Sequence, residues 1–219
     1  MTTRQHYAKE LEHLQRMILR MGCMMEEALK KSMDALVNQD IGLAQEVIDG
    51  DDRLDDMELT IEDICAKMIA MEQPVATDLR TILTALKIIT DLERMADHAV
   101  DIAKIAIRLK DEVYIKPLID LPRMADIAIQ MVKDSLEAYV DHDAEKAEEI
   151  TRRDDVVDGI NRQIFRELLT YMMENQKNIT QATSFLFVSK YLERIGDHAT
   201  NVCEWVIYAA TGERKELNH

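Results

Sequence analysis

Apolar residues recur at alternating intervals of three and four over 11–36, which predicts a helix that packs against other helices. The apolar positions are Leu11, Leu14, Ile18, Met21, Met25, Ala28 and Leu36, with Ser32 filling one slot. The pattern then stops, and Asp40 is placed to cap a second helix that runs to about residue 71. Pro74 ends this helix, and a third helix is expected over about 76–110.

The same plan recurs after a break. The stretch 111–122 contains two prolines and shows no helical period, so we interpret residues 112–121 as a linker. Three further helices are expected, the second of them capped by Asp143, over about 122–140, 143–175 and 180–212.

An octapeptide in the third helix is repeated in the sixth. LERMADHA begins at Leu92 and LERIGDHA begins at Leu192, and six of the eight positions are identical. KSMDALV from Lys31 likewise resembles DSLEAYV from Asp134. This duplication predicts an all-α fold of two tandem, pseudo-symmetric three-helix bundles with six long helices. The expected boundaries are 1–111 for the first bundle, 112–121 for the linker, 122–212 for the second bundle and 213–219 for a tail.

Composition and charge narrow the possible functions. The 219 residues are 47% hydrophobic, with three prolines and six glycines, which suits a nearly all-helical protein. The net charge of −15 argues against nucleic-acid binding, which needs a basic surface. The absence of a long apolar run and of a signal peptide predicts a cytoplasmic protein with no transmembrane segment. Three cysteines with apolar neighbours, Cys23, Cys65 and Cys203, are interpreted as buried free thiols in a reducing compartment.

Carboxylates spaced at i and i+4 share one face of a helix, and each half of the chain contains two such faces. In the first half they are Asp51 and Asp55 on the second helix, with Glu58 one turn further, and Glu93, Asp97 and Asp101 on the third. In the second half they are Asp154 and Asp158 on the fifth helix, and Glu193, Asp197 and Asn201 on the sixth. Asp52 and Asp155 lie beside these stripes. Because consecutive antiparallel helices carry them, the two stripes of each half are expected to face one another.

An acidic stripe is commonly only a solvated face, but carboxylates at this spacing repel one another, and the octapeptide has changed little since the duplication. We therefore interpret the stripes as cation sites. Clustered oxygens without thiolates favour Mg²⁺, Mn²⁺, Ca²⁺ or iron, and Zn²⁺ less. His98 and His198 are expected to be polar neighbours rather than ligands, and Arg94 and Arg194 to pair with the carboxylates or contact an anion beside a metal.

At these residues the chain resembles the PhoU family, the cytoplasmic accessory proteins of bacterial phosphate uptake and signalling. The resemblance spans about 21–208 and rests on the two octapeptides and on the segments DGDDRLDD, RRDDVVD and QPVATDLR. It implies metal ions, often iron or zinc, held at motifs of an acidic residue followed four positions later by Asp. The motifs fall on Asp51 and Asp55, Glu93 and Asp97, Asp154 and Asp158, and Glu193 and Asp197, with Asp101 and Asn201 extending them.

The resemblance also implies a negative regulator that helps to hold the phosphate-starvation response off. Its implied partners are the ATP-binding subunit of the phosphate ABC transporter and a membrane histidine kinase, which would place the protein peripherally at the inner membrane. We therefore expect a non-enzymatic adaptor with no catalytic residues, and a homodimer formed through its wide apolar helix faces. Two alternatives stay open, a carboxylate-bridged dimetal enzyme and a purely structural helical scaffold.

Overall fold

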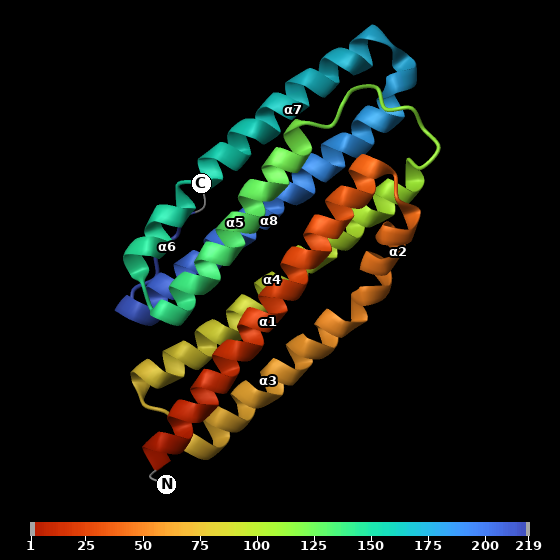
Figure 1. The fold of residues 1–219 in the computed structure, drawn as a ribbon. Coiled ribbons are helices and arrows are strands. Elements are labelled where there is room, and N and C mark those ends of the chain that lie inside the picture. The colour runs from red at the N-terminus through yellow and green to blue at the C-terminus, as the bar shows by residue number, and fades with distance from the viewer. Residues whose placement is uncertain (1–2, 218–219) are drawn as a thin grey trace.

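The structure, a computed structural model, describes residues 3–217 and contains only helices and connecting segments within that range. The α-helices are α1 (Thr3–Asn38), α2 (Ile41–Gly50), α3 (Asp52–Glu72), α4 (Ala76–Arg108), α5 (Asp120–Asp141), α6 (Ala144–Thr151), α7 (Asp154–Glu174) and α8 (Ile179–Thr211), and a short 3-10 helix, η1 (Gln176–Asn178), precedes α8 (Figure 1). The predicted all-α fold with a tandem repeat is confirmed. None of these helices is long and apolar enough to cross a membrane.

The six predicted long helices appear as six rods, two of which are broken. The second rod consists of α2 and α3, which meet at Asp51, and the fifth consists of α6 and α7, which meet at Arg152 and Arg153. At these two arginines ψ is −18° and −19°, close to 3-10 geometry, so the helix tightens there before it continues. The predicted caps are present, because Asp40 accepts a hydrogen bond from the backbone NH of the third residue after it, and Asp143 does the same.

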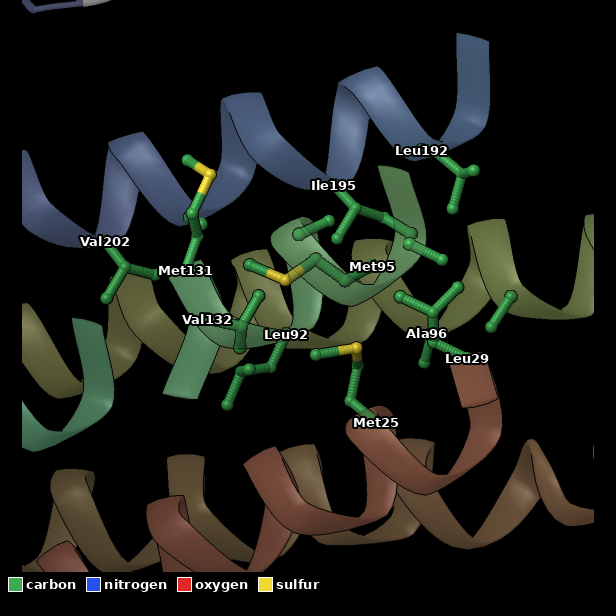
Figure 2. Packing of buried hydrophobic residues seen from close by; sticks show 14 of the residues in the cluster. Met25, Leu29, Leu92, Met95, Ala96, Met131, Val132, Leu192, Ile195 and Val202 are labelled. Atoms are coloured by element: carbon green, nitrogen blue, oxygen red, sulfur yellow. The ribbon is translucent and has the colours of Figure 1, made fainter. Parts of the chain in front are cut away.

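The two halves share one hydrophobic core. Helix α4 packs lengthwise on α8, and α1 packs on α5, so the helices that carry the octapeptides lie side by side at the centre of the molecule (Figure 1). Figure 2 shows Leu92 and Met95 of α4, Ile195 of α8, Met25 of α1 and Met131 of α5 in the space between these helices. All five side chains are fully buried. The sequence predicted the two bundles but not their fusion through this shared core.

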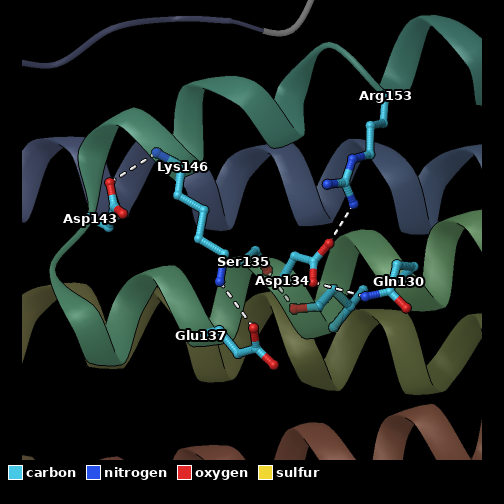
Figure 3. Close-up of polar contacts among 8 residues, drawn as sticks. Gln130, Asp134, Ser135, Glu137, Asp143, Lys146 and Arg153 are labelled. Atoms are coloured by element: carbon cyan, nitrogen blue, oxygen red, sulfur yellow. Dashed lines mark hydrogen bonds and ion pairs between the residues drawn. The ribbon is translucent and has the colours of Figure 1, made fainter.

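Ion pairs hold the broken rod of the second half onto α5. Arg153, at the break, pairs with Asp134, and Lys146 of α6 pairs with Glu137 at 3.0 Å (Figure 3). The first half solves the same problem differently. Lys31 of α1 occupies the position equivalent to Asp134, and it pairs with Glu46 of α2 at 3.7 Å as well as with Glu27 of its own helix at 2.8 Å. The duplication has therefore kept the backbone plan while exchanging the charges that support it.

The cysteines correct one expectation. Cys65 and Cys203 are buried free thiols, as predicted, but Cys23 is exposed. Position 23 lies two residues from both Met21 and Met25, which places it roughly 200° around the helix from each of them, on the solvent side of α1. The apolar neighbours in sequence are therefore not neighbours on the same helix face.

Gly22 allows α1 to approach α5 closely, and this gives a testable prediction. A Cβ atom at Gly22 would lie 2.2 Å from Cδ1 of the buried Leu136. Gly22→Val is therefore expected to lower the free energy of unfolding by about 1–3 kcal/mol through overpacking. At Gly159 a Cβ meets no atom within 4 Å, so Gly159→Val is expected to change it by less than about 0.5 kcal/mol. Urea unfolding of both variants tests this, and equal effects would contradict the close packing of α1 on α5.

Candidate metal centres

The first acidic patch forms between α3 and α4. Asp51 lies at the start of α3 and is half-buried, and the electrostatic neighbours that raise its pKa include Asp55 of the same helix and Asp97 of α4. Glu93 of α4 is likewise close to Glu58 of α3. The two predicted stripes of the first half therefore face one another, and Glu58, one turn beyond Asp55, belongs to the patch.

Crowding in this patch changes how readily its acids lose protons. The pKa of Glu93 is raised to about 7, first by burial and then by the neighbouring charges of Asp97, Glu58 and Asp55. The pKa of Asp97 is raised for the same reasons, burial first, then Asp55 and Asp101. Lys104 is the only cation of α4 paired with a motif carboxylate among residues 3–217, and it lies 3.6 Å from Asp101. The patch is thus under-neutralised by the described part of the chain.

The second patch, between α7 and α8, is more enclosed. Asp154 begins α7, and its Oδ1 atom is buried with no hydrogen-bond partner among residues 3–217. Burial raises the pKa of Asp154 to about 7, and the charges of Asp197, Asp158 and Glu193 add to the effect. Gly196 of α8 makes room for this carboxylate, because a Cβ at that position would lie 2.8 Å from the same oxygen. The octapeptide has Ala96 at the equivalent position in the first half.

Several motif residues already have other partners. Asp158 pairs with Arg162 at 3.4 Å, and Glu193 pairs with Lys190. Asn201 donates a hydrogen bond at 3.3 Å to Asp91 of α4, so its amide nitrogen is directed at the boundary between the halves. The amide lacks the negative charge of Asp101, its counterpart in the first half. The second patch therefore consists of four carboxylates without Asn201: Asp154 and Asp158 of α7, and Glu193 and Asp197 of α8.

The secondary candidates lie at the edges of the patches. Asp52 and Asp155 are exposed beside the half-buried Asp51 and Asp154. The two arginines of the octapeptides are also exposed: Arg94 lowers the pKa of Glu93, and Arg194 lowers that of Asp197, each as a minor contribution. The predicted pairing of these arginines with the carboxylates stays a prediction.

The chemistry of these side chains suits a hard cation, but their present positions do not form a coordination site. All the facing groups are oxygens, they repel one another, and Asp154 holds an orphaned buried oxygen. However, no group of three or more His, Cys, Asp or Glu side chains within residues 3–217 is arranged to hold a metal ion as it stands. Metal binding would therefore require side-chain rotations that bring the carboxylates of facing helices onto one centre. The predicted ligation stays a prediction.

The octapeptide histidines turn away from both patches and meet between the halves. The ring of His98 lies 6.0 Å from that of His198 and stacks on Tyr191 at 5.3 Å. The Nδ1 atom of His198 donates a hydrogen bond to Asp91 at 2.8 Å. Asp91 and Tyr191 occupy equivalent positions one hundred residues apart, so each histidine meets the partner that the other half supplies. Asp91 was not singled out by the sequence analysis, although an acid beside Leu92 on the apolar side of the helix was a usable signal.

This buried hydrogen bond predicts a loss of stability when Asp91 is removed. Only 8% of Asp91 and 5% of His198 is exposed, so Asp91→Ala leaves a buried imidazole donor without a partner. We expect the free energy of unfolding to fall by about 1–3 kcal/mol. Chemical denaturation of Asp91→Ala beside the exposed-site control Asp126→Ala measures the difference. Equal stability of the two variants would show that the contact contributes nothing.

The comparisons with known proteins agree with this geometry. The chain matches the PhoU domain twice, over residues 18–106 and 121–206. It is 48% identical over 217 residues to the phosphate-specific transport system accessory protein PhoU homolog of Clostridium acetobutylicum, with 99% of each chain covered. It is 42% identical to the homolog of the same name from Rhizobium meliloti, covering 96% of this chain and 89% of that protein.

Two crystal structures show the same fold. PhoU from Pseudomonas aeruginosa superposes with a TM-score of 0.90 at 36% identity, covering 94% of this chain and 100% of that one. The phosphate transport system regulatory protein PhoU from Streptococcus pneumoniae gives a TM-score of 0.89 at 30% identity, covering 96% of this chain and 99% of the other. The duplicated sequence, the repeated helical fold and these relatives together establish that the chain belongs to the PhoU family.

Proposed function

We propose that this chain is a non-enzymatic regulator of phosphate homeostasis, an accessory protein of the phosphate-specific transport system. The observation that carries this proposal is the 48% identity, over nearly the whole of both chains, to a protein of that name. The Streptococcus pneumoniae neighbour is likewise named a phosphate transport system regulatory protein. In this proposal the protein acts in the cytoplasm and helps to hold the phosphate-starvation response off.

The proposed partners are the ATP-binding subunit of the phosphate ABC transporter and a phosphate-sensing histidine kinase. An adaptor of this kind acts by binding one state of its partner more tightly than another. A rigid body suits the task, and the shared core of α1, α4, α5 and α8 supplies one. We further propose that it works as a homodimer and reaches the inner membrane through its partners.

Metal ions have a structural role in this proposal. In the first half Asp51, Asp55, Glu93 and Asp97 would hold the ion, extended by Asp101, and in the second half the equivalent carboxylates would do so. A bound iron, zinc, magnesium or manganese ion would supply positive charge to patches whose carboxylate pKa values are raised first by burial and then by mutual repulsion. Neutralising that repulsion would fix α3 on α4 and α7 on α8.

Hydrogen exchange and a binding assay test the two parts of this proposal separately. Exchange at residues 88–101 and 190–202 is expected to be slower in the metal-loaded protein and to speed up with a chelator. Unchanged exchange would remove the structural role of the metal. The full chain is expected to bind the purified transporter subunit and the cytoplasmic part of the kinase. If it binds neither of them, the regulatory role is wrong.

The placement of the histidines favours an adaptor over a dimetal enzyme. Carboxylate-bridged dimetal enzymes of helical bundles place His ligands beside their carboxylates inside the bundle. In this chain the octapeptide histidines instead contact each other, Tyr191 and Asp91. The relatives are also named accessory or regulatory proteins. A hydrolase or oxidase assay with added Fe²⁺ or Mn²⁺ is therefore expected to give no turnover above that of the free ion.

A further inference from the structure

The outer face of α7 and α8 carries large apolar side chains that no described element covers. Phe165 of α7 is 54% exposed and Phe187 of α8 is 50% exposed. Leu169 and Met173 continue the apolar row along α7, one and two turns beyond Phe165. On proteins, an exposed apolar surface of this kind commonly marks a site of interaction with another molecule.

A groove runs between these two helices. It has a volume of about 590 Å³, and its lining includes Arg162, Phe165, Arg166, Phe187 and Lys190. Its lining comes from residues 161–166 of α7 and 183–190 of α8, two antiparallel helices that pack side by side (Figure 1). Its shape is that of the hollow between two packed helices, into which the side chains of a third helix fit.

The internal duplication shows that the fold does not require this surface. The positions equivalent to Phe165 and Phe187 in the first half are Glu62 and Lys87, and the position equivalent to Arg166 is Asp63. Leu169 and Met173 correspond to alanines in the same comparison. The same pair of rods is therefore formed in the first half without aromatic residues on its outer face. The aromatic groove belongs to the second half alone.

The charges around the groove indicate what would fill it. The charged side chains lining it are all cationic, Arg162, Arg166 and Lys190, in a chain of net charge −15. Asp158 and Glu193 of the second acidic patch neutralise two of them in part, and they lie outside the lining. A second copy of the chain would bring the same cations and the same large negative charge, and an anionic bilayer would repel that charge. A helix of another protein with acidic residues beside its apolar face would pair with these cations, and it would bring neither the cations nor the net charge of a second copy.

We propose that the α7–α8 groove is the docking surface for an amphipathic helix of a partner protein, with Phe165 and Phe187 contacting its apolar face and Arg162, Arg166 and Lys190 facing acidic residues beside it. Apolar residues of that helix at intervals of three and four would enter the groove. This inference rests on the proposed function, since it assigns the face through which the regulator engages the transporter's ATP-binding subunit or the kinase.

Binding of these two purified partners to the full chain and to matched variants tests the assignment. The variant Phe165→Ala/Phe187→Ala removes both aromatic anchors, and Leu59→Ala/Leu83→Ala is its control, because both leucines are exposed on the equivalent rods of the first half. We expect the first variant to weaken binding by about 30-fold or more, as loss of interface anchors does, and the control to bind like the wild type. Arg166→Glu is expected to weaken binding and to reduce its dependence on salt.

The possible results separate the two proposals. If the wild type binds and Phe165→Ala/Phe187→Ala binds equally well, the groove is not the docking surface, and the regulatory role stands. If the wild type binds neither partner, both proposals are wrong. If the aromatic variant keeps partner binding but loses binding to phosphatidylglycerol vesicles, or loses self-association in sedimentation, the groove serves a membrane or a second copy instead. Thermal unfolding of each variant establishes that it is folded.

Discussion

Asp154→Asn is expected to make the metal-free protein more stable at pH 8 and to flatten the pH dependence of its stability. The folded-state pKa of Asp154 is about 7, against an ordinary value of 3.8. Between these values the native protein binds more protons at this site than the unfolded chain does. The stability associated with this proton is therefore complete below about pH 4 and is lost as the pH rises through about 7. Asparagine cannot ionise and so does not lose it.

The expected gain at pH 8 is roughly 1–2 kcal/mol, after a discount because part of the side chain faces solvent. Urea unfolding in the presence of a chelator at pH 5 and pH 8 measures it. Asp155→Asn is the matched control, because Asp155 is the exposed neighbour and should show little change at either pH. If Asp154→Asn destabilises the protein at pH 8, the carboxylate is stabilised by contacts rather than strained by burial and repulsion.

Addition of metal is expected to stabilise the wild type through the Asp154 carboxylate, whereas without metal the loss of this carboxylate is expected to stabilise the protein. A cation that binds the native protein at one hundred times its dissociation constant raises the free energy of unfolding by about 2.7 kcal/mol. The increase is expected to be larger at pH 8 than at pH 5, because protons compete with the metal for carboxylates whose pKa values are raised. Asp154→Asn, stabilised without metal, should lose most of the metal-dependent increase contributed by the second patch.

Thermal unfolding with and without Mn²⁺ or Fe²⁺ measures this effect in the wild type and the variant. Asp51→Asn removes the equivalent residue of the first patch and should reduce the increase in the same way. Equal stabilisation of the wild type and of a variant lacking both residues would mean that the metal binds elsewhere. The opposite signs expected for Asp154→Asn without and with metal distinguish a cation site from an ordinary buried carboxylate.

Helical periodicity and the internal repeat were sufficient to predict the six long helical segments and the facing of the acidic stripes. Local rules determine both features: the cap at Asp40, the stop at Pro74 and the spacing of Glu93 and Asp97 act within one or two turns of a helix. The breaks at Asp51 and Arg153 were missed because the apolar period continues through them. The exposed side of Cys23 was missed because its apolar neighbours in sequence lie on another face of α1.

Features that depend on packing between the halves could not be predicted from either half alone. The hydrogen bond from His198 to Asp91 joins residues on α8 and α4, and no motif relates their positions. The same bonding explains why Asn201 turns toward Asp91 rather than toward the carboxylates of its own stripe. The orphaned oxygen of Asp154 also depends on packing, since it results from the space that Gly196 leaves on the neighbouring helix.

We propose that folding gathers the duplicated carboxylates into two cation sites. This is tested by the metal content of protein that is purified without metal-affinity resin, dialysed against Fe²⁺, Mn²⁺ or Zn²⁺ and measured by elemental analysis. We expect the wild type to retain metal, Asp55→Asn/Asp97→Asn to lose the share held by the first patch, and Asp158→Asn/Asp197→Asn to lose the share held by the second. Retention of the same metal content by all three proteins, or of none by the wild type, would contradict the presence of cation sites at these carboxylates.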